Sequence, residues 1–174
     1  MSETPTWFLI IQVVTTITLV ATFIAFLAQL RTMQKQLEVA KQSTLAQNTL
    51  AVAQFLSQPE IRASRRHMFR NLAGKKLSDW SDEDRIEAER VCSSYDVTGL
   101  LVRAGIADRD IIIENWGASL RRLYLVALPL IGEMRKLSGD LNYWDDFEWL
   151  AKQVDLKLAH PSNAASDSGT DKEQ

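Results

Sequence analysis

Hydrophobic and polar positions divide the chain at residue 30. The 24 residues from Trp7 to Leu30 carry no charged side chain, whereas charged residues recur throughout the rest of the sequence. At about 1.5 Å per residue, a helix of this length extends about 36 Å, which is enough to cross the hydrocarbon core of a bilayer. We therefore expect a transmembrane helix over residues 7–30, preceded by a short external N-terminus at residues 1–6.

A cleaved signal peptide is the competing interpretation of this apolar run. Such a peptide has a basic start and an apolar core of about 7–15 residues. Residues 1–6 contain no Lys or Arg, and the run is longer than that core. The sequence therefore predicts an uncleaved, single-pass anchor. Because Arg31, Lys35 and Lys41 follow the run, the positive-inside rule places the C-terminal part in the cytoplasm, with the anchor in the inner (plasma) membrane.

Nothing in the sequence ends this helix at the edge of the apolar run. There is no Gly or Pro from Gln29 to Ser57, and Pro59 suits the first turn of a new helix. We therefore predict a helical stalk over residues 31–58. Apolar or small residues recur along it with nearly the 3.5-residue period of a coiled coil, at Leu30, Met33, Leu37, Ala40, Thr44, Ala51 and Phe55.

Two stripes on this helix predict self-association. Small hydrogen-bonding side chains on one face of a spanning helix favour helix pairing in lipid, and an apolar stripe favours it in water. The candidate residues are Thr15, Thr18, Thr22, Met33, Leu37 and Ala40. A homodimer is the favoured homo-oligomer. Two alternatives remain open, since the threonines can bond to carbonyls of their own helix and the stalk can pack on the protein's own helices.

The remaining sequence predicts a cytoplasmic helical domain over residues 59–158. Low Gly and Pro contents, 7 and 4 residues, favour helix, and apolar positions recur at helical spacing. The predicted fold class is all-α, with a transmembrane helix that continues into a long helix followed by a four-helix bundle. The four helices are expected at 59–74, 81–105, 109–138 and 142–158. Pro129 should kink or split the third, and the polar residues 159–174 should form a disordered tail.

One group of polar residues in the predicted domain is a candidate site. Asp96 lies in an otherwise apolar stretch, VCSSYDVTGLLV, and a buried carboxylate needs a partner. Arg121 or Arg122 of the next helix can supply it, and Asn115 lies nearby in sequence. The predicted polar cluster is therefore Asp96, Asn115, Arg121 and Arg122. A structural ion pair is the favoured interpretation, and a ligand-binding or catalytic carboxylate is the alternative.

Other residue types that carry chemistry occur without a recognisable pattern. The two histidines are not at metal-ligand spacing, the single cysteine has no neighbouring histidine, and no Gly-rich phosphate loop occurs. We therefore expect no catalytic residue, no cofactor and no metal.

The net charge of −2 conceals a strong asymmetry. Residues 31–76 hold nine Lys or Arg and two acids, whereas residues 77–174 hold eleven and nineteen. A basic segment close to a membrane is suited to an anionic surface, and the acidic remainder argues against nucleic acid as a partner. The candidate contact residues are Arg62, Arg65, Arg66, Arg70, Lys75 and Lys76.

Four stretches of the sequence are distinctive in order and spacing: QPEIRASRR, ERVCSSYDVTGLLVRAG, ENWGASLRRLY and YWDDFEWLA. In them the chain resembles a bacterial family of short, single-span membrane proteins known only as a domain of unknown function. The resemblance covers residues 7 to about 154. It implies a membrane-anchored helical domain without an assigned activity.

These observations favour one function class over another. We expect a non-enzymatic, membrane-anchored interaction or scaffold module that self-associates and presents its domain to an unidentified cytoplasmic protein. The alternative is a membrane-tethered small-ligand sensor or enzyme with a polar pocket near Asp96, Asn115 and Arg121. Convergence of these three side chains on an open cavity would favour the alternative.

Overall fold

Helices joined by short loops, without a strand, make up residues 6–159, the part of the chain that the computed structural model describes, which confirms the predicted all-α class. The side chains of Thr6, residues 8–14 and Ala21 are not described, and the expected tail at 160–174 and residues 1–5 of the expected N-terminus lie outside the described residues. The elements are α1 (Thr6–Leu56), α2 (Pro59–His67), η1 (Met68–Leu72), η2 (Leu77–Asp79), α3 (Asp82–Arg103), α4 (Arg109–Ser138) and α5 (Asp145–Ala159).

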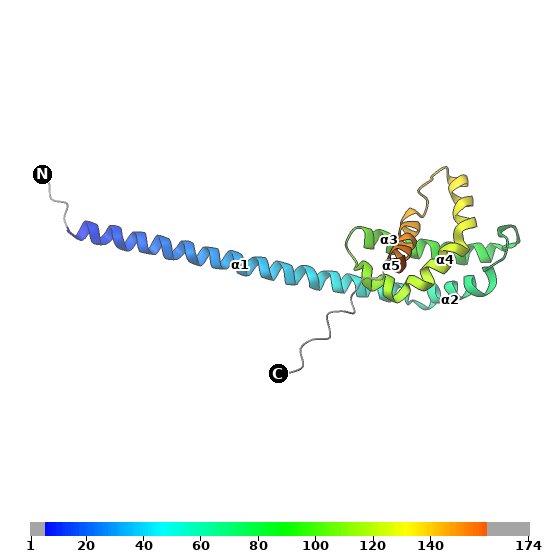
Figure 1. Cartoon of the computed structure of the whole chain (residues 1–174), viewed down its shortest axis with the longest axis horizontal. Helices are drawn as coiled ribbons and strands as arrows, with labels where there is room; N and C mark the ends of the chain where they lie inside the picture. The colour runs from blue at the N-terminus through cyan, green and yellow to red at the C-terminus, as the bar shows by residue number, and fades with distance from the viewer. Residues whose placement is uncertain (1–5, 160–174) are drawn as a thin grey trace, which may run out of the picture. The chain divides into compact units, whose positions relative to one another are not determined.

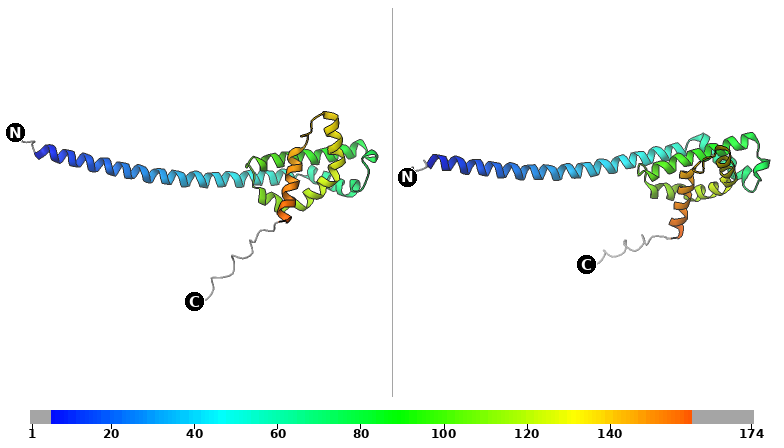
Figure 2. Two further views of the ribbon diagram at one scale, coloured as in Figure 1. Left: turned by 45° about the horizontal axis from the view of Figure 1, so that its top comes forward. Right: turned by 90° about the horizontal axis from the view of Figure 1, so that it is seen from above.

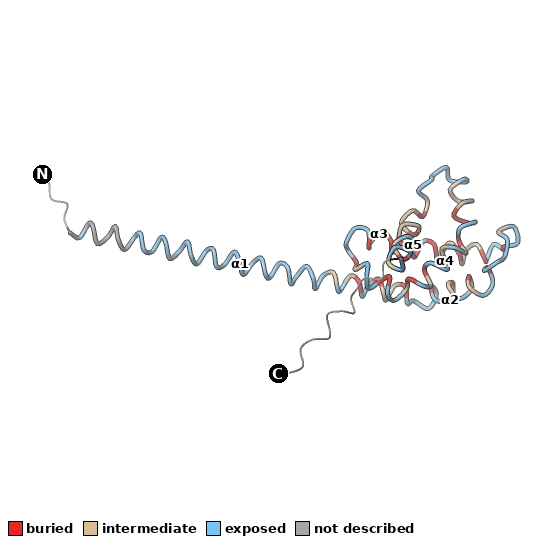
Figure 3. Tube along the Cα trace, viewed as in Figure 1, coloured by how far each residue is buried: buried red, intermediate tan, exposed pale blue. Residues whose placement is uncertain are grey.

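The chain forms two compact units, Met1–Thr44 and Leu45–Gln174. The first consists of the N-terminal part of α1, whose described side chains are all exposed (Figure 3). Among the described residues, α1 is the one helix long and apolar enough to cross a membrane. None of its most apolar 18-residue window is buried, which distinguishes it from the core helix of a soluble protein.

The second unit begins earlier in the sequence than the predicted boundary at residue 59. The last three turns of α1 belong to it, because Val52 and Leu56 are buried and the Thr49 hydroxyl accepts a hydrogen bond from the backbone N–H of Asp108 at 2.8 Å. The predicted stalk is therefore helical as expected, but its C-terminal half, from Leu45 onward, is part of the folded domain.

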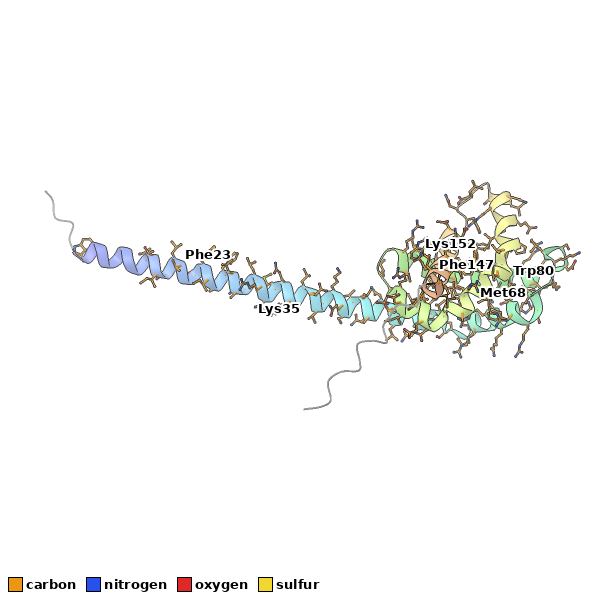
Figure 4. The ribbon with its side chains drawn as sticks, viewed as in Figure 1. Phe23, Lys35, Met68, Trp80, Phe147 and Lys152 are labelled. Carbon is orange, nitrogen blue, oxygen red and sulfur yellow. The ribbon has the colours of Figure 1, made fainter. Side chains whose placement is uncertain are left out.

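Within this second unit, α2 continues beyond the end of α1, and α3 returns beside it in the opposite direction (Figures 1 and 2). Helices α4 and α5 pack against α3. Tyr95 of α3 and Phe147 of α5 stack at the centre of the core with ring centroids 5.3 Å apart, and both are fully buried (Figure 4). Tyr124 of α4 meets the edge of the Phe147 ring, so one aromatic cluster joins three helices.

Local signals set several of the helix ends. The Ser81 hydroxyl accepts a hydrogen bond from the backbone N–H of Asp84, and the Asp84 carboxylate accepts one from the backbone N–H of Ser81, which completes a capping box. Asp108 caps α4 through the N–H of Ile111. Gly139 ends α4 with φ of 69°, a left-handed conformation that favours glycine.

Helix α4 continues through Pro129 without a break, and its ribbon changes direction along its length (Figures 1 and 2), so of the two expected effects the proline kinks the helix and does not split it. Pro129 is exposed, so water can satisfy the carbonyl that loses its N–H partner, while buried Ala127 and Leu130 hold both halves on the core. Helix α5 begins at Asp145 and not at 142, because buried Trp144 adopts φ of 57°.

Candidate functional site

The predicted polar cluster does not assemble. The Asp96 carboxylate accepts a hydrogen bond from the backbone N–H of Phe147 at 3.1 Å and forms no ion pair with a described residue. Asn115 donates to the carbonyl of Ile111 in its own helix, and Arg121 pairs with Asp155 at the surface. The expected Asp96–arginine pair is therefore wrong, because α4 directs Arg121 towards α5 and away from Asp96. The fourth member, Arg122, lies over the ring of Phe69, with its Cζ atom 4.8 Å from the ring centroid.

Asp96 instead supports the start of α5 from the neighbouring helix. Its carboxylate satisfies one of the N–H groups that the first turn of any helix leaves unpaired. Burial raises the pKa of Asp96, and the nearby Asp146 and Asp145 carboxylates add to this effect, although the hydrogen bond from Phe147 opposes it. Helices α3 and α5 approach closely here, because a Cβ atom on Gly99 would lie 2.6 Å from the carbonyl carbon of Asp146. The arrangement is structural.

A second titratable group lies at the start of α3. Asp84 is buried, and its carboxylate binds the Lys75 ammonium at 2.8 Å, the His67 Nε2 atom at 2.6 Å and the N–H of Ser81 at 3.0 Å. The hydrogen bonds from Lys75, His67 and Ser81 hold the pKa of Asp84 well below its usual range. Ser81 and Asp84 have the spacing of a capping box, whereas no sequence signal identifies His67 or Lys75 as partners of Asp84.

These contacts change the composition of the predicted basic surface. Lys75 is neutralised by Asp84, and Arg65 is half-buried and donates to the phenol oxygen of Tyr95 at 3.2 Å. Lys75 already pairs with a carboxylate and Arg65 is partly buried with one nitrogen engaged, so both are less available to an anionic partner than the exposed arginines are. Lys76 is exposed in the turn after η1. The predicted set therefore loses two members.

Three arginines of the predicted set remain exposed, and together with Arg122 they form a group that we call the basic surface: Arg62, Arg66, Arg70 and Arg122. The first three follow at four-residue spacing along α2 and η1, on the side opposite the buried residues Ile61 and Met68. Arg122 joins them from α4, because its guanidinium stacks on Phe69 of η1. None of the four pairs with a carboxylate within the described part of the chain.

An apolar groove forms where the end of α1 meets α3 and the loop that follows it. Its volume is about 280 Å³, and it is open on one side. The lining residues are Asn48, Ala51, Val52, Phe55, Val97, Leu101 and Ile106. Val97 and Ile106 are 47% and 43% exposed, so apolar surface reaches solvent at the groove. The groove can accept an apolar side chain or helix face, but it offers no titratable group for catalysis.

The predicted self-association residues lie in the first unit and are exposed. Met33 and Leu37 expose 63% and 72% of their surface, and Ala40 is also exposed. The Thr22 hydroxyl donates to the carbonyl of Thr18 in its own helix at 2.8 Å, which is the alternative that the sequence left open for these threonines. Thr15 and Thr18 are exposed as well. Figure 4 shows Phe23 and Lys35 on this helix.

Metal-ligating side chains do not gather in the described residues, where no group of three or more His, Cys, Asp or Glu is placed to hold an ion. Cys92 is fully buried in α3, and burial raises its pKa far above the usual range for a thiol. Such a thiol remains protonated and packs as a small apolar group.

The chain is thus an all-α domain attached to a long, exposed apolar helix. The family model described as "Domain of unknown function (DUF4760)" matches residues 14–154, which include most of α1 and nearly all of the domain. The chain therefore belongs to the DUF4760 family. No curated protein and no solved structure shows significant similarity to it.

Proposed function

We propose that this protein is a non-enzymatic, membrane-anchored interaction module that associates with a second copy of itself. Its apolar helix crosses the inner membrane of a bacterial cell once, with the N-terminus outside and the helical domain in the cytoplasm. Support comes from the charge-free run from Trp7 to Leu30, whose described side chains are exposed, and from Arg31, Lys35 and Lys41, which follow it.

The observation that carries the proposal is the exposed apolar stripe of α1. Met33, Leu37 and Ala40 recur at spacings of four and three, so they share one face of a helix that continues without interruption through them. Burying a leucine side chain stabilises a protein or complex by about 1.5–3 kcal/mol. A second copy presents the same stripe in the same register, and a parallel pair would bury both.

Two residues that line the apolar groove continue the sequence spacing of this stripe. Ala51 and Phe55 belong to the same heptad-like series as Met33 and Leu37, and both line the groove. We infer that the second copy packs along α1 as far as this groove. The polar-pocket alternative has less support, because Asp96, Asn115 and Arg121 have separate partners.

Energy transfer between differently labelled copies of the full-length protein in liposomes tests the proposal. Leu37→Lys places a charge in the exposed stripe and Ala51→Lys places one in the groove, so both should lower the transfer efficiency. Gln42→Lys adds the same charge on the opposite face of α1 and serves as the matched control. Equal transfer in all three variants and in the unmodified protein would contradict self-association through this face.

A separate experiment tests the orientation. A reporter that is active only in the cytoplasm should be active when fused after Gln174. An export-dependent reporter at the same position should be inactive, and activity from it would refute the proposed topology.

A further inference from the structure

Cations in the second unit fall into two groups that differ in whether an acid neutralises them. Nine lysines and arginines of its described part pair with carboxylates, as in the Arg85–Glu133, Arg103–Asp146 and Arg135–Glu148 pairs. The exposed cations without such a partner are Arg62, Arg66, Arg70, Lys76, Arg122 and Lys136. Five of these six lie on α2, on η1, in the turn after η1 or, for Arg122, against η1. The exposed cations that lack a carboxylate partner are therefore concentrated on one surface, formed by α2, η1 and the turn after η1.

The basic surface consists of arginines, and two of them are held in place by neighbouring groups, which suits a specific contact with a partner. Arginine presents a planar fork of donors that binds carboxylate or phosphate with two hydrogen bonds, and it needs less ordering to do so than lysine. Arg122 is held against Phe69, and the Arg62 guanidinium donates to the carbonyl of Ser57 at 2.9 Å. Two of the four guanidinium groups are thus restrained, which reduces the entropy lost on binding.

We propose that the basic surface of Arg62, Arg66, Arg70 and Arg122 binds an acidic segment of a cytoplasmic protein. This inference names the class of partner for the proposed interaction module and rests on that function for its biological meaning. The surface lies on helices of the second unit, whereas the proposed contact between copies follows α1 and the apolar groove. The two surfaces therefore predict different effects of different substitutions.

A lipid surface is less well matched to these arginines. In α1, 26 helical residues, or about 39 Å of helix at 1.5 Å per residue, follow the apolar run before α2 begins. The field of a charged membrane acts on a cation within about 8 Å at physiological salt. Nucleic acid is also less well matched, because residues 77–174 hold nineteen acids against eleven Lys or Arg and would repel a long polyanion.

The test uses the full-length protein in nanodiscs of zwitterionic lipid and a fluorescent 12-residue peptide of alternating Glu and Ser. Fluorescence anisotropy should show binding that weakens as salt increases. The double variant Arg66→Glu and Arg70→Glu should weaken binding about tenfold or more, because it reverses two charges in the contact. The matched control, Arg109→Glu and Lys136→Glu, changes the net charge equally at exposed positions elsewhere and should bind within about twofold of the unmodified protein.

Several results would overturn the proposal. Equal losses in both double variants would mean that the peptide senses only the total charge. An unchanged affinity in the Arg66 and Arg70 variant would mean that it binds elsewhere. Binding of a 20-base-pair DNA duplex in place of the peptide would assign the surface to nucleic acid, and loss of peptide binding in nanodiscs that contain phosphatidylglycerol would assign it to lipid. Thermal unfolding of each variant verifies that it is folded.

A failure of the proposed function would be recognised separately. Leu37→Lys should lower the efficiency of energy transfer between copies without changing the affinity for the peptide. The double variant Arg66→Glu and Arg70→Glu should weaken peptide binding without changing the energy transfer between copies. Loss of both properties in either variant would contradict two independent surfaces.

Discussion

Replacing Gly99 with alanine tests the packing of α3 against α5. A Cβ atom at this position would lie 2.6 Å from the backbone carbonyl carbon of Asp146 and closer still to its oxygen. An ordinary carbon–oxygen contact is about 3.3 Å or longer, so the two helices must separate by about 1 Å. The obstacle is backbone, which cannot rotate away as a side chain can. The change also disturbs the hydrogen bond from Phe147 to Asp96 at the same junction.

The expected magnitude combines two opposing terms. Alanine is favoured over glycine in a helix by about 1 kcal/mol, whereas forcing extra volume into a packed contact costs about 1–3 kcal/mol. Because backbone opposes backbone here, we take the upper end of that range and expect a net loss of about 2 kcal/mol. For a domain of this size the corresponding fall in melting temperature is about 8 °C.

Gly132→Ala is the matched control. Gly132 lies inside α4, and a Cβ atom there would meet nothing within 4 Å. Only the higher helix propensity of alanine applies here, so the free energy of unfolding of this variant should increase by about 0.5–1 kcal/mol. Tryptophan fluorescence of the full-length protein in detergent, followed during heating, measures both variants. A Gly99→Ala variant that is as stable as Gly132→Ala would refute the close approach of α3 and α5.

Three further predictions concern the titratable groups. Asp96→Ala should destabilise the domain by about 1–2 kcal/mol because it leaves the Phe147 N–H unpaired. Asp96→Asn keeps an acceptor oxygen and should change the stability by less than about 0.5 kcal/mol. Equal losses of stability in the two variants would contradict the capping role of Asp96. Asp84→Asn should cost about 1–2 kcal/mol at pH 7, measured by thermal unfolding, because it removes the charge that Lys75 and His67 bind. Folding lowers the pKa of Asp84, so the stability that this carboxylate contributes is fully present above the unfolded pKa of about 4 and is lost as pH falls through the folded pKa. The difference in unfolding free energy between Asp84→Asn and the unmodified protein should therefore shrink steadily below pH 4. A difference that stays constant down to pH 2 would contradict this ion pair.

The helices could be predicted from the sequence because their signals are local. The capping box of Ser81 and Asp84, the cap at Asp108 and the glycine at 139 each act within a few residues, and apolar spacing identifies the buried faces. The start of α5 was misplaced because the left-handed conformation of Trp144 depends on packing of its ring in the core and not on a local signal.

The candidate site could be predicted only in part, since its contacts depend on how helices are rotated against each other. Asp96 was recognised as a constrained carboxylate, but its partner is a backbone N–H of α5 and not an arginine of α4. The basic segment was recognised from its charge, but which of its cations remain exposed and unpaired depends on contacts between helices. Lys75 forms an ion pair with Asp84, Arg65 donates a hydrogen bond to Tyr95, and Arg122 packs against the segment from a helix about fifty residues later in the sequence.

Cysteine crosslinking along α1 tests the central claim of a self-associating, membrane-anchored helix most directly. Single cysteines at Met33, Leu37 and Ala40, in a protein with Cys92→Ala, should form disulfides between copies in isolated membranes, because a parallel pair brings identical positions within the roughly 7 Å that a disulfide needs. Cysteines at Lys35 and Gln42 lie about 180–200° around the helix from Met33 and should crosslink poorly. Absent crosslinks at all five positions, or equal crosslinks at all five, in protein recovered from the membrane fraction would contradict the claim.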